Sequence, residues 1–158
     1  MEHLVDDLMA IVNDLKGKNV ILNNLGMFDV RALKAHNKES APQRSNSPIV
    51  PFTREEVAAA DCIVKAIKIL PLLLRKTTRK AMTGSYGLKH YVERLITSAN
   101  WGSYMGNGHL ILAMLYLKYD YKPDPKGSLN CFFLADYADN DFRSARADTV
   151  AEHLKIWI

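Results

Sequence analysis

Apolar residues recur at helical spacing along most of this chain. Residues 3–16 place their leucines and valines on one side of a predicted helix, and Gly17 follows as a candidate C-terminal cap. A short second helix is predicted from Asp29 to about residue 36. The segment 38–51 contains three prolines and three serines and few apolar groups. We therefore expect an exposed loop at 38–51.

The helix after this loop has the clearest predicted start. Thr53 and Glu56 match the T-x-x-E capping box, in which each side chain binds the backbone N–H of the other residue. The apolar stripe continues past Pro71, which lacks the N–H that a helix interior needs, so a kink or restart is predicted there. We expect the second piece to end in the basic segment 75–80, because cations favour a helix C-terminus.

Two further helices are predicted between residues 87 and 119. Residues 87–98 form an amphipathic pattern with charged groups on one side. A turn-rich connection follows, with Asn107 as the candidate N-terminal cap of helix 107–119. Helix 107–119 is apolar nearly all round, and such a helix must be buried, so we expect it at the centre of the core. Gly87, Asn107 and Gly108 are predicted to be structural turn residues.

The C-terminal part of the chain has a mixed pattern. The apolar segment near 129–135 is compatible with either a short strand or an extended plug, and an amphipathic helix is predicted from Asp141 onward. Because helices dominate, the predicted fold class is mainly α: an irregular helical bundle around the buried central helix 107–119, with at most a short strand near 129–135. The chain of 158 residues is expected to form a single helical domain, 1–158.

The positive charge of the chain is concentrated in its middle third. The net charge is +4, and residues 39–98 carry ten basic against five acidic groups, whereas both flanking thirds are nearly balanced. The alternative to a binding surface is ordinary helix capping and a solvated face, but four cations within 75–80 exceed what capping requires. Because a short turn joins the two helices concerned, their basic groups are expected to converge on one surface that meets a polyanion. The predicted contact residues are Arg75, Lys76, Arg79, Lys80, Lys89, His90 and Arg94.

Helices 87–98 and 107–119 do not match a helix-turn-helix. Their connection of about eight residues is longer than the three or four of that motif. Helix 107–119 also offers few outward polar side chains, whereas base reading needs Arg, Asn or Gln on the recognition helix. Any nucleic acid is therefore expected to bind through its phosphate backbone, without sequence specificity.

The sequence contains little that indicates catalysis or metal binding. Its five histidines are scattered, without the i, i+4 or C-x-x-C spacing of zinc sites. A G-x-S-x-G elbow, a P-loop and a dinucleotide-binding fingerprint are also missing from the sequence. We therefore predict no catalytic residues, no metal and no cofactor, and hence not an enzyme. The residues that come closest to a catalytic cluster lie near each other only because they belong to the first turns of one helix. They are Ser85, Tyr86, Lys89, His90 and Glu93.

Cysteine use and the N-terminal sequence bear on the location of the protein. Cys62 and Cys131 lie far apart in apolar surroundings and are expected to be small buried hydrophobes, which suits a reducing compartment; whether they pair stays open. Acidic residues stand where a secretory signal would be basic, and no apolar run is long enough to span a membrane. The predicted location is intracellular, in a host cell, or within a virion; we predict that the protein is not secreted and has no membrane partner. The oligomeric state stays open.

About one third of the chain carries a motif. S-Y-G-L-K-H occupies residues 85–90, Glu93 follows three residues after the histidine, and Y-x-x-N-G-x-L-I-x-A occupies residues 104–113. This pattern resembles small uncharacterised proteins encoded by phages, plasmids and large DNA viruses. Similar proteins place an asparagine before an aromatic residue after the second helix, which Asn130 and the phenylalanines after it match. The resemblance implies a viral or mobile-element context and supplies no activity.

Two functions of different classes fit these observations. The first is a small viral or mobile-element helical protein that contacts nucleic acid non-specifically through the basic surface at residues 75–94. The alternative is a structural or assembly protein, such as a minor virion component, that acts through protein–protein contacts. The loop at 38–51 and the C-terminal sequence EHLKIWI favour the alternative. The expected partner of the basic surface is the phosphate backbone of a nucleic acid or an acidic protein surface.

Overall fold

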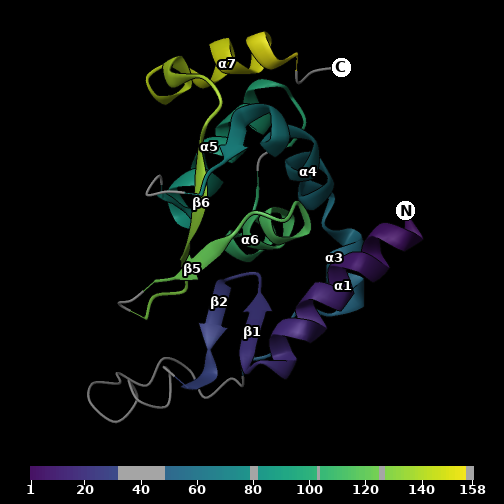
Figure 1. Cartoon of the computed structure of the whole chain (residues 1–158). Helices are drawn as coiled ribbons and strands as arrows, with labels where there is room; N and C mark the ends of the chain where they lie inside the picture. Colours follow the sequence, from purple (N-terminus) through teal and green to yellow (C-terminus); the bar gives the residue numbers. More distant parts are fainter. Residues whose placement is uncertain (32–48, 79–81, 103, 125–126, 156–158) are drawn as a thin grey trace, which may run out of the picture.

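The computed structural model describes residues 1–31, 49–78, 82–102, 104–124 and 127–155. Pairs of strands lie between the helices along these residues (Figure 1). The elements are α1 (Glu2–Gly17), β1 (Val20–Asn23), β2 (Gly26–Asp29), α3 (Arg54–Ala59), α4 (Asp61–Leu73), β3 (Leu74–Lys76), β4 (Met82–Gly84), α5 (Ser85–Ser98), α6 (Asn107–Tyr116), β5 (Tyr121–Pro123), β6 (Cys131–Tyr137), the 3-10 helix η1 (Asn140–Arg143) and α7 (Ala147–Leu154).

Two antiparallel sheets make the fold α/β, so the predicted mainly α class is wrong. Strands β1 and β2 form a hairpin, and β6, at the place of the short strand considered near 129–135, is the centre of a four-stranded sheet. Strand β4 pairs with one edge of β6, while β3 and β5 pair with the other edge. These three partners have three residues each, too few to show the alternation of polar and apolar positions that identifies a strand. They are strands because their backbones pair with β6.

The helix predictions after residue 50 are correct in part. The capping box is confirmed: Thr53 N donates to Glu56 Oε2 at 2.8 Å, and Glu56 N donates to Thr53 Oγ1 at 3.2 Å. The restart predicted at Pro71 is wrong, because the helix is interrupted at Ala60 and α4 continues through Pro71 to Leu73. The chain after α4 pairs with β6 instead of continuing as a helix, so Arg75 lies on a strand.

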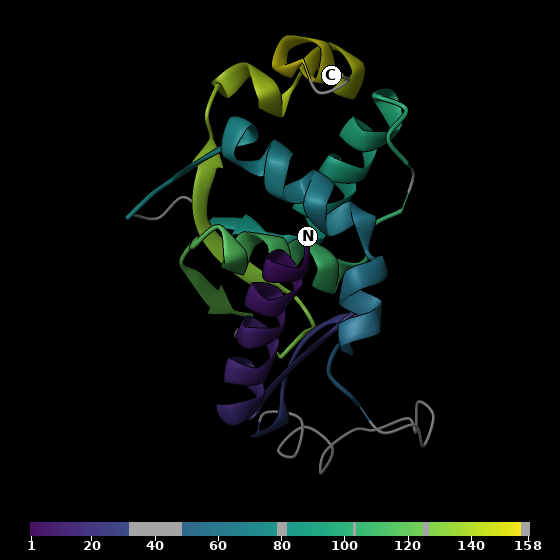
Figure 2. The ribbon, with the colours of Figure 1, turned by 90° about the vertical axis from the view of Figure 1, so that its right-hand side faces the viewer.

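Helix α6 lies at the centre of the molecule, between the β1–β2 hairpin and helices α4 and α5 (Figure 1). Seven of its ten residues are buried, which confirms the central helix predicted at 107–119, although it ends at Tyr116. It packs against α1, α4, α5 and the hairpin, whereas α7 packs on α5. The hairpin and α7 therefore lie at opposite ends of the molecule, as the two views agree (Figures 1 and 2).

Some predictions fall largely or wholly on residues outside the described ranges. They are the short helix at 29–36, the loop at 38–51, and the basic residues Arg79 and Lys80. Within the described part of the chain, each helix is too short or too polar to cross a membrane. Cys62 and Cys131 are both free thiols.

Candidate functional site

The motif residues of α5 converge on the carboxylate of Glu93. Its Oε1 atom accepts a hydrogen bond from Met105 N at 2.9 Å and lies 3.2 Å from Lys89 Nζ, while its Oε2 atom lies 3.3 Å from His90 Nδ1. The side chains of Lys89 and Glu93 are only 13% and 16% exposed. Glu93 therefore anchors the connection between α5 and α6, and it holds Lys89 away from solvent.

Asn107 joins the two sheets. It is the first residue of α6 and not its N-terminal cap, a position that Gly106 occupies. Its side-chain amide donates to Asn130 Oδ1 at 2.9 Å, and it lies 3.2 Å from Leu129 O and 3.4 Å from Leu25 O. The hairpin turn, the start of α6 and the residues before β6 are thus tied together by one buried amide.

Close backbone approaches surround this amide. A Cβ added to Gly108 would lie 1.6 Å from Asn23 O, and one added to Gly106 would lie 1.8 Å from Asn24 Oδ1. On the other side of the sheet, Ser85 Oγ accepts a hydrogen bond from Cys131 N at 3.1 Å. Ser85, Glu93, Asn107 and Gly108 of the motif therefore hold separate segments of the fold together.

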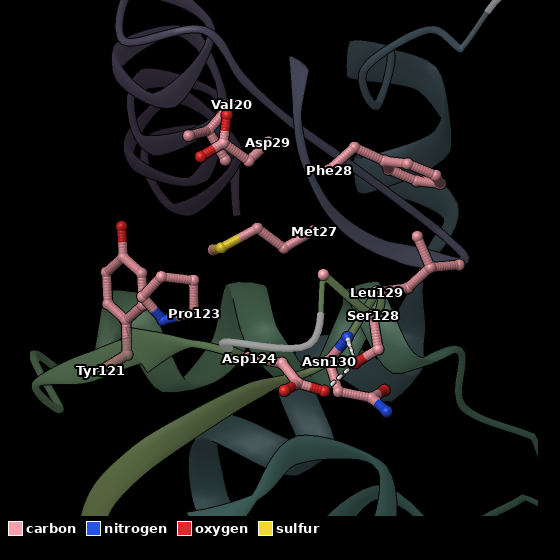
Figure 3. A pocket seen from close by; sticks show the side chains of 11 residues that line it. Val20, Met27, Phe28, Asp29, Tyr121, Pro123, Asp124, Ser128, Leu129 and Asn130 are labelled. Carbon is pink, nitrogen blue, oxygen red and sulfur yellow. Dashed lines mark hydrogen bonds between the residues drawn. The ribbon is translucent and has the colours of Figure 1, made fainter. Parts of the chain in front are cut away.

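A cavity of about 190 Å³ lies between the hairpin and the chain from β5 to β6, and Figure 3 shows the side chains that line it. The side chain of Met27 points across it toward Tyr121 and Pro123, and the polar side chains of Asp124 and Asn130 lie on the opposite side (Figure 3). Met27 N donates to Leu129 O at 2.9 Å and links the two segments. The cavity thus lies between the two sheets, beside the hydrogen bond between Asn107 and Asn130.

The five predicted basic contact residues that the structure describes do not line one groove. Arg75 lies 3.6 Å from Asp136, and Lys76 Nζ lies 5.4 Å from the centre of the Tyr119 ring. Lys89 is turned onto Glu93. Of the described members, only His90 and Arg94 face a common groove.

That groove runs between α5 and the η1–α7 segment and has a volume of about 750 Å³. Arg143 and Arg146 line it opposite Arg94, and their side chains are 60% and 83% exposed. We call it the arginine groove. Its lining residues are His90, Tyr91, Glu93, Arg94, Thr97, Ser98, Arg143, Ala145, Arg146, Ala147 and Asp148.

Two of these arginines lie over aromatic rings. The guanidinium of Arg94 lies 5.5 Å from the centre of the Tyr91 ring, and that of Arg143 lies 5.8 Å from the Tyr137 ring. Arg143 also bonds the carboxylate of Asp136, and this bond holds the pKa of Asp136 below its usual value. Contact with a ring face orients a guanidinium without using its in-plane N–H donors, so those of Arg94 and those that Arg143 does not give to Asp136 can bind an anion.

Sequence reasoning missed Arg143 and Arg146 because the last third of the chain is slightly acidic overall. The local sequence F-R-S-A-R at 142–146 does show two cations three residues apart. Only the packing of α7 on α5 places them opposite Arg94.

A second groove, of about 460 Å³, lies at the junction of α3, α4 and the α5–α6 connection. Four aromatic side chains line it: Phe52, Trp101, Tyr104 and His109. We call it the aromatic groove. Its other lining residues are Asn24, Glu56, Ala59, Ala60, Asp61, Cys62, Lys65, Ile96 and Gly102.

His109 is a fixed, neutral side chain in the aromatic groove. Its ring stacks on Phe52 with centres 5.2 Å apart, and its Nδ1 atom accepts a hydrogen bond from Gly106 N at 3.0 Å. Burial lowers the pKa of His109 and favours the neutral ring, and because Nδ1 accepts the hydrogen bond from Gly106 N, the ring proton resides on Nε2. Burial also raises the pKa of the nearby Cys62 to about 11, which leaves a thiol and not a nucleophilic thiolate at neutral pH.

Within the described residues, no group of three or more His, Cys, Asp and Glu side chains is placed to hold a metal ion. No model of a known protein family, no curated protein sequence and no solved structure matches the chain.

Proposed function

We propose that this protein binds the phosphate backbone of nucleic acid, without sequence specificity, through the arginine groove. The observation that supports the proposal is the convergence on one open groove of Arg94, from α5, with Arg143 and Arg146, from the η1–α7 segment. Guanidinium groups bind phosphate oxygens through paired, planar N–H donors. The motif resemblance to phage, plasmid and large-virus proteins adds the proposed setting, which is the handling of a viral or mobile-element genome.

The two acidic residues that line the groove do not prevent it from binding phosphate. Glu93 is engaged by Lys89 and by Met105 N, so its charge is already compensated. Asp148 pairs with Arg146 at 3.0 Å, but their side chains are 56% and 83% exposed. Exposed pairs contribute little, about 0–1 kcal/mol, and a phosphate can replace such a carboxylate.

The absence of sequence specificity follows from the kind of side chain in the groove. Its cations are three arginines, which can hold a phosphate backbone, and no Asn or Gln among the described lining residues is placed to read an adenine edge. Affinity should therefore depend on salt, and little on base sequence.

The experiment is a salt titration with a charge-matched control. We would replace Arg94, Arg143 and Arg146 together by Gln, and in the control Lys16, Lys68 and Lys122, which are exposed cations outside the groove. Binding to labelled oligonucleotides of random sequence is measured by fluorescence anisotropy from low to physiological salt. The groove variant should lose most of its affinity, and the slope of log K against log salt should fall by about 2–3. The lysine variant should keep most of its affinity.

Equal binding by the two variants and the wild type would contradict the proposal. Far-ultraviolet circular dichroism and thermal melting of each variant show whether it is folded, and all substituted side chains are exposed.

A second candidate function is assembly with another protein. Leu25 and Val50 are 62% and 56% exposed, and Asn23 Nδ2 donates to Val50 O at 3.1 Å, so the two apolar side chains flank the same hairpin end. Exposed apolar patches of this kind mark protein contacts. If the wild type binds no nucleic acid at low salt, the assembly function takes first place.

A further inference from the structure

The arginine groove and the aromatic groove share a border. Ile96, in the last turn of α5, lines the aromatic groove, and the next residue, Thr97, lines the arginine groove. Thr97 Oγ1 donates to the carbonyl of Gly102, which lines the aromatic groove, at 3.3 Å. The two grooves therefore adjoin at the end of α5.

The two grooves differ in what they can bind. The arginine groove carries three guanidinium groups and fits phosphate. The aromatic groove carries two carboxylates, Glu56 and Asp61, which disfavour phosphate but can accept hydrogen bonds from exocyclic amino groups. Glu56 is engaged by Thr53 N, and Asp61 pairs with Lys65 at 2.6 Å. The aromatic groove is thus suited to a neutral planar group.

The aromatic side chains are placed for stacking. Tyr104 is 62% exposed, Trp101 is half-buried, and His109 is held flat on Phe52. Because Nδ1 of His109 already accepts a hydrogen bond, its remaining ring nitrogen is an N–H donor. Aromatic rings beside a charged backbone track are the means by which proteins bind unpaired bases.

We infer that the natural ligand is single-stranded nucleic acid, with its phosphates in the arginine groove and at least one unpaired base in the aromatic groove. The inference rests on the proposed function, since it assigns the type of nucleic acid that the arginine groove binds. A duplex offers the same phosphates, but its bases are stacked inside the helix and cannot enter the aromatic groove. Single strands should therefore bind more tightly than duplex of the same length.

The test uses the two tryptophans of the chain, Trp101 and Trp157. Trp157→Phe leaves Trp101 as the only tryptophan, so its fluorescence reports directly on the aromatic groove. The probes are an oligothymidylate of about twelve residues and a mixed-sequence duplex of equal length. We expect the single strand to quench Trp101 fluorescence and the duplex to leave it nearly unchanged.

Substitutions at Tyr104 test the stacking itself. Tyr104→Ala should weaken single-strand binding by about 5- to 100-fold and leave duplex binding unchanged. Tyr104→Phe keeps the ring and loses only the hydroxyl contact with Asn24, so it should keep most of the affinity. Tyr86→Ala is the matched control, because Tyr86 is 54% exposed and lines neither groove; it should leave the ratio of single-strand to duplex affinity unchanged.

Two other results would overturn the inference in distinguishable ways. Equal affinity for both probes, with Trp101 unquenched and the arginines still required, would refute the single-strand assignment and leave the proposed function intact. Binding of neither probe at low salt would refute both. Thermal melting of each variant confirms that the comparison is made between folded proteins.

Discussion

Two glycines of the motif have different surroundings. Gly87 lies in the first turn of α5, exposed, and an added Cβ would meet nothing within 4 Å. Gly108 lies in the first turn of α6, where an added Cβ would be 1.6 Å from Asn23 O. Gly87 is a helical residue and not a turn residue, whereas Gly108 is needed so that the hairpin can approach α6.

Alanine at these two positions should therefore have opposite effects. Gly87→Ala is expected to raise the free energy of unfolding by about 0.5 kcal/mol, because glycine in a helix costs conformational entropy. Gly108→Ala is expected to lower it by more than about 3 kcal/mol, because the hairpin would have to move. Urea unfolding measures both. Similar effects of the two substitutions would contradict the close approach.

Asn107→Ala should lower the free energy of unfolding by about 1–3 kcal/mol. The amide is 7% exposed and its donors serve the hairpin, the segment before β6 and Asn130, so the loss would leave buried acceptors unpaired. This exceeds the effect expected of a simple helix cap. Asn13→Ala, on the exposed side of α1, is the control and should change stability by less than about 0.5 kcal/mol.

At the scale of elements, the start of α6 should respond to pH through His109. Burial lowers the pKa of His109 below its ordinary value, and Glu56 opposes this only in part. The folded state thus favours the neutral ring, whose contribution to stability is present above about pH 6.5 and is lost as the pH falls through the folded pKa. Protonation of Nδ1 also breaks its hydrogen bond with Gly106 N.

Thermal melting between pH 7.5 and 5.5 tests this dependence. His109→Gln keeps an acceptor for Gly106 N and cannot titrate, so it should lose less melting temperature on acidification than the wild type. His3→Gln, on the exposed surface of α1, should behave like the wild type. If all three proteins lost the same melting temperature on acidification, the pH dependence would come from groups other than His109.

The elements that could be predicted from the sequence are those whose formation depends on local contacts. The box of Thr53 and Glu56 involves residues three positions apart, and the apolar surface of α6 is visible in its own composition. Strands β3, β4 and β5 could not be predicted, because each has three residues and depends on a distant partner, β6. The mainly α prediction failed for that reason, and also because it missed the local β1–β2 hairpin, whose four-residue strands are joined by Asn24 and Leu25 and not by an Asn-Gly or Asp-Gly turn.

The same limit applies to the candidate site at the scale of the whole molecule. His90 and Arg94 could be found in the sequence because they lie in its basic third. The expected convergence with Arg75 and Lys76 assumed two helices joined by a turn, but these two residues lie on β3. Arg143, Arg146 and the aromatic groove arise from packing between segments far apart in the chain, which charge counts along a sequence do not report.

The central position of α6 should make unfolding cooperative across the molecule. The hairpin packs on one side of α6, and α4 and α5 pack on another, so both ends share one buried helix (Figure 1). Leu112 is 0% exposed, and Leu112→Ala should lower the free energy of unfolding by about 2–5 kcal/mol. Because both ends depend on α6, native-state hydrogen exchange should show the same loss of protection in β1 and in α5.

Leu72→Ala is the control, since Leu72 is 50% exposed and its loss should cost less than about 1 kcal/mol. If Leu112→Ala lowered protection in α5 and left the hairpin amides unchanged, the hairpin would be an independently folded unit. In that case, a substitution in the hairpin could not weaken binding at the grooves by lowering the stability of the rest of the molecule. Equal losses in both regions instead mean that any substitution near Asn107 changes the population of the whole folded state, so binding by such variants must be compared at matched fractions of folded protein.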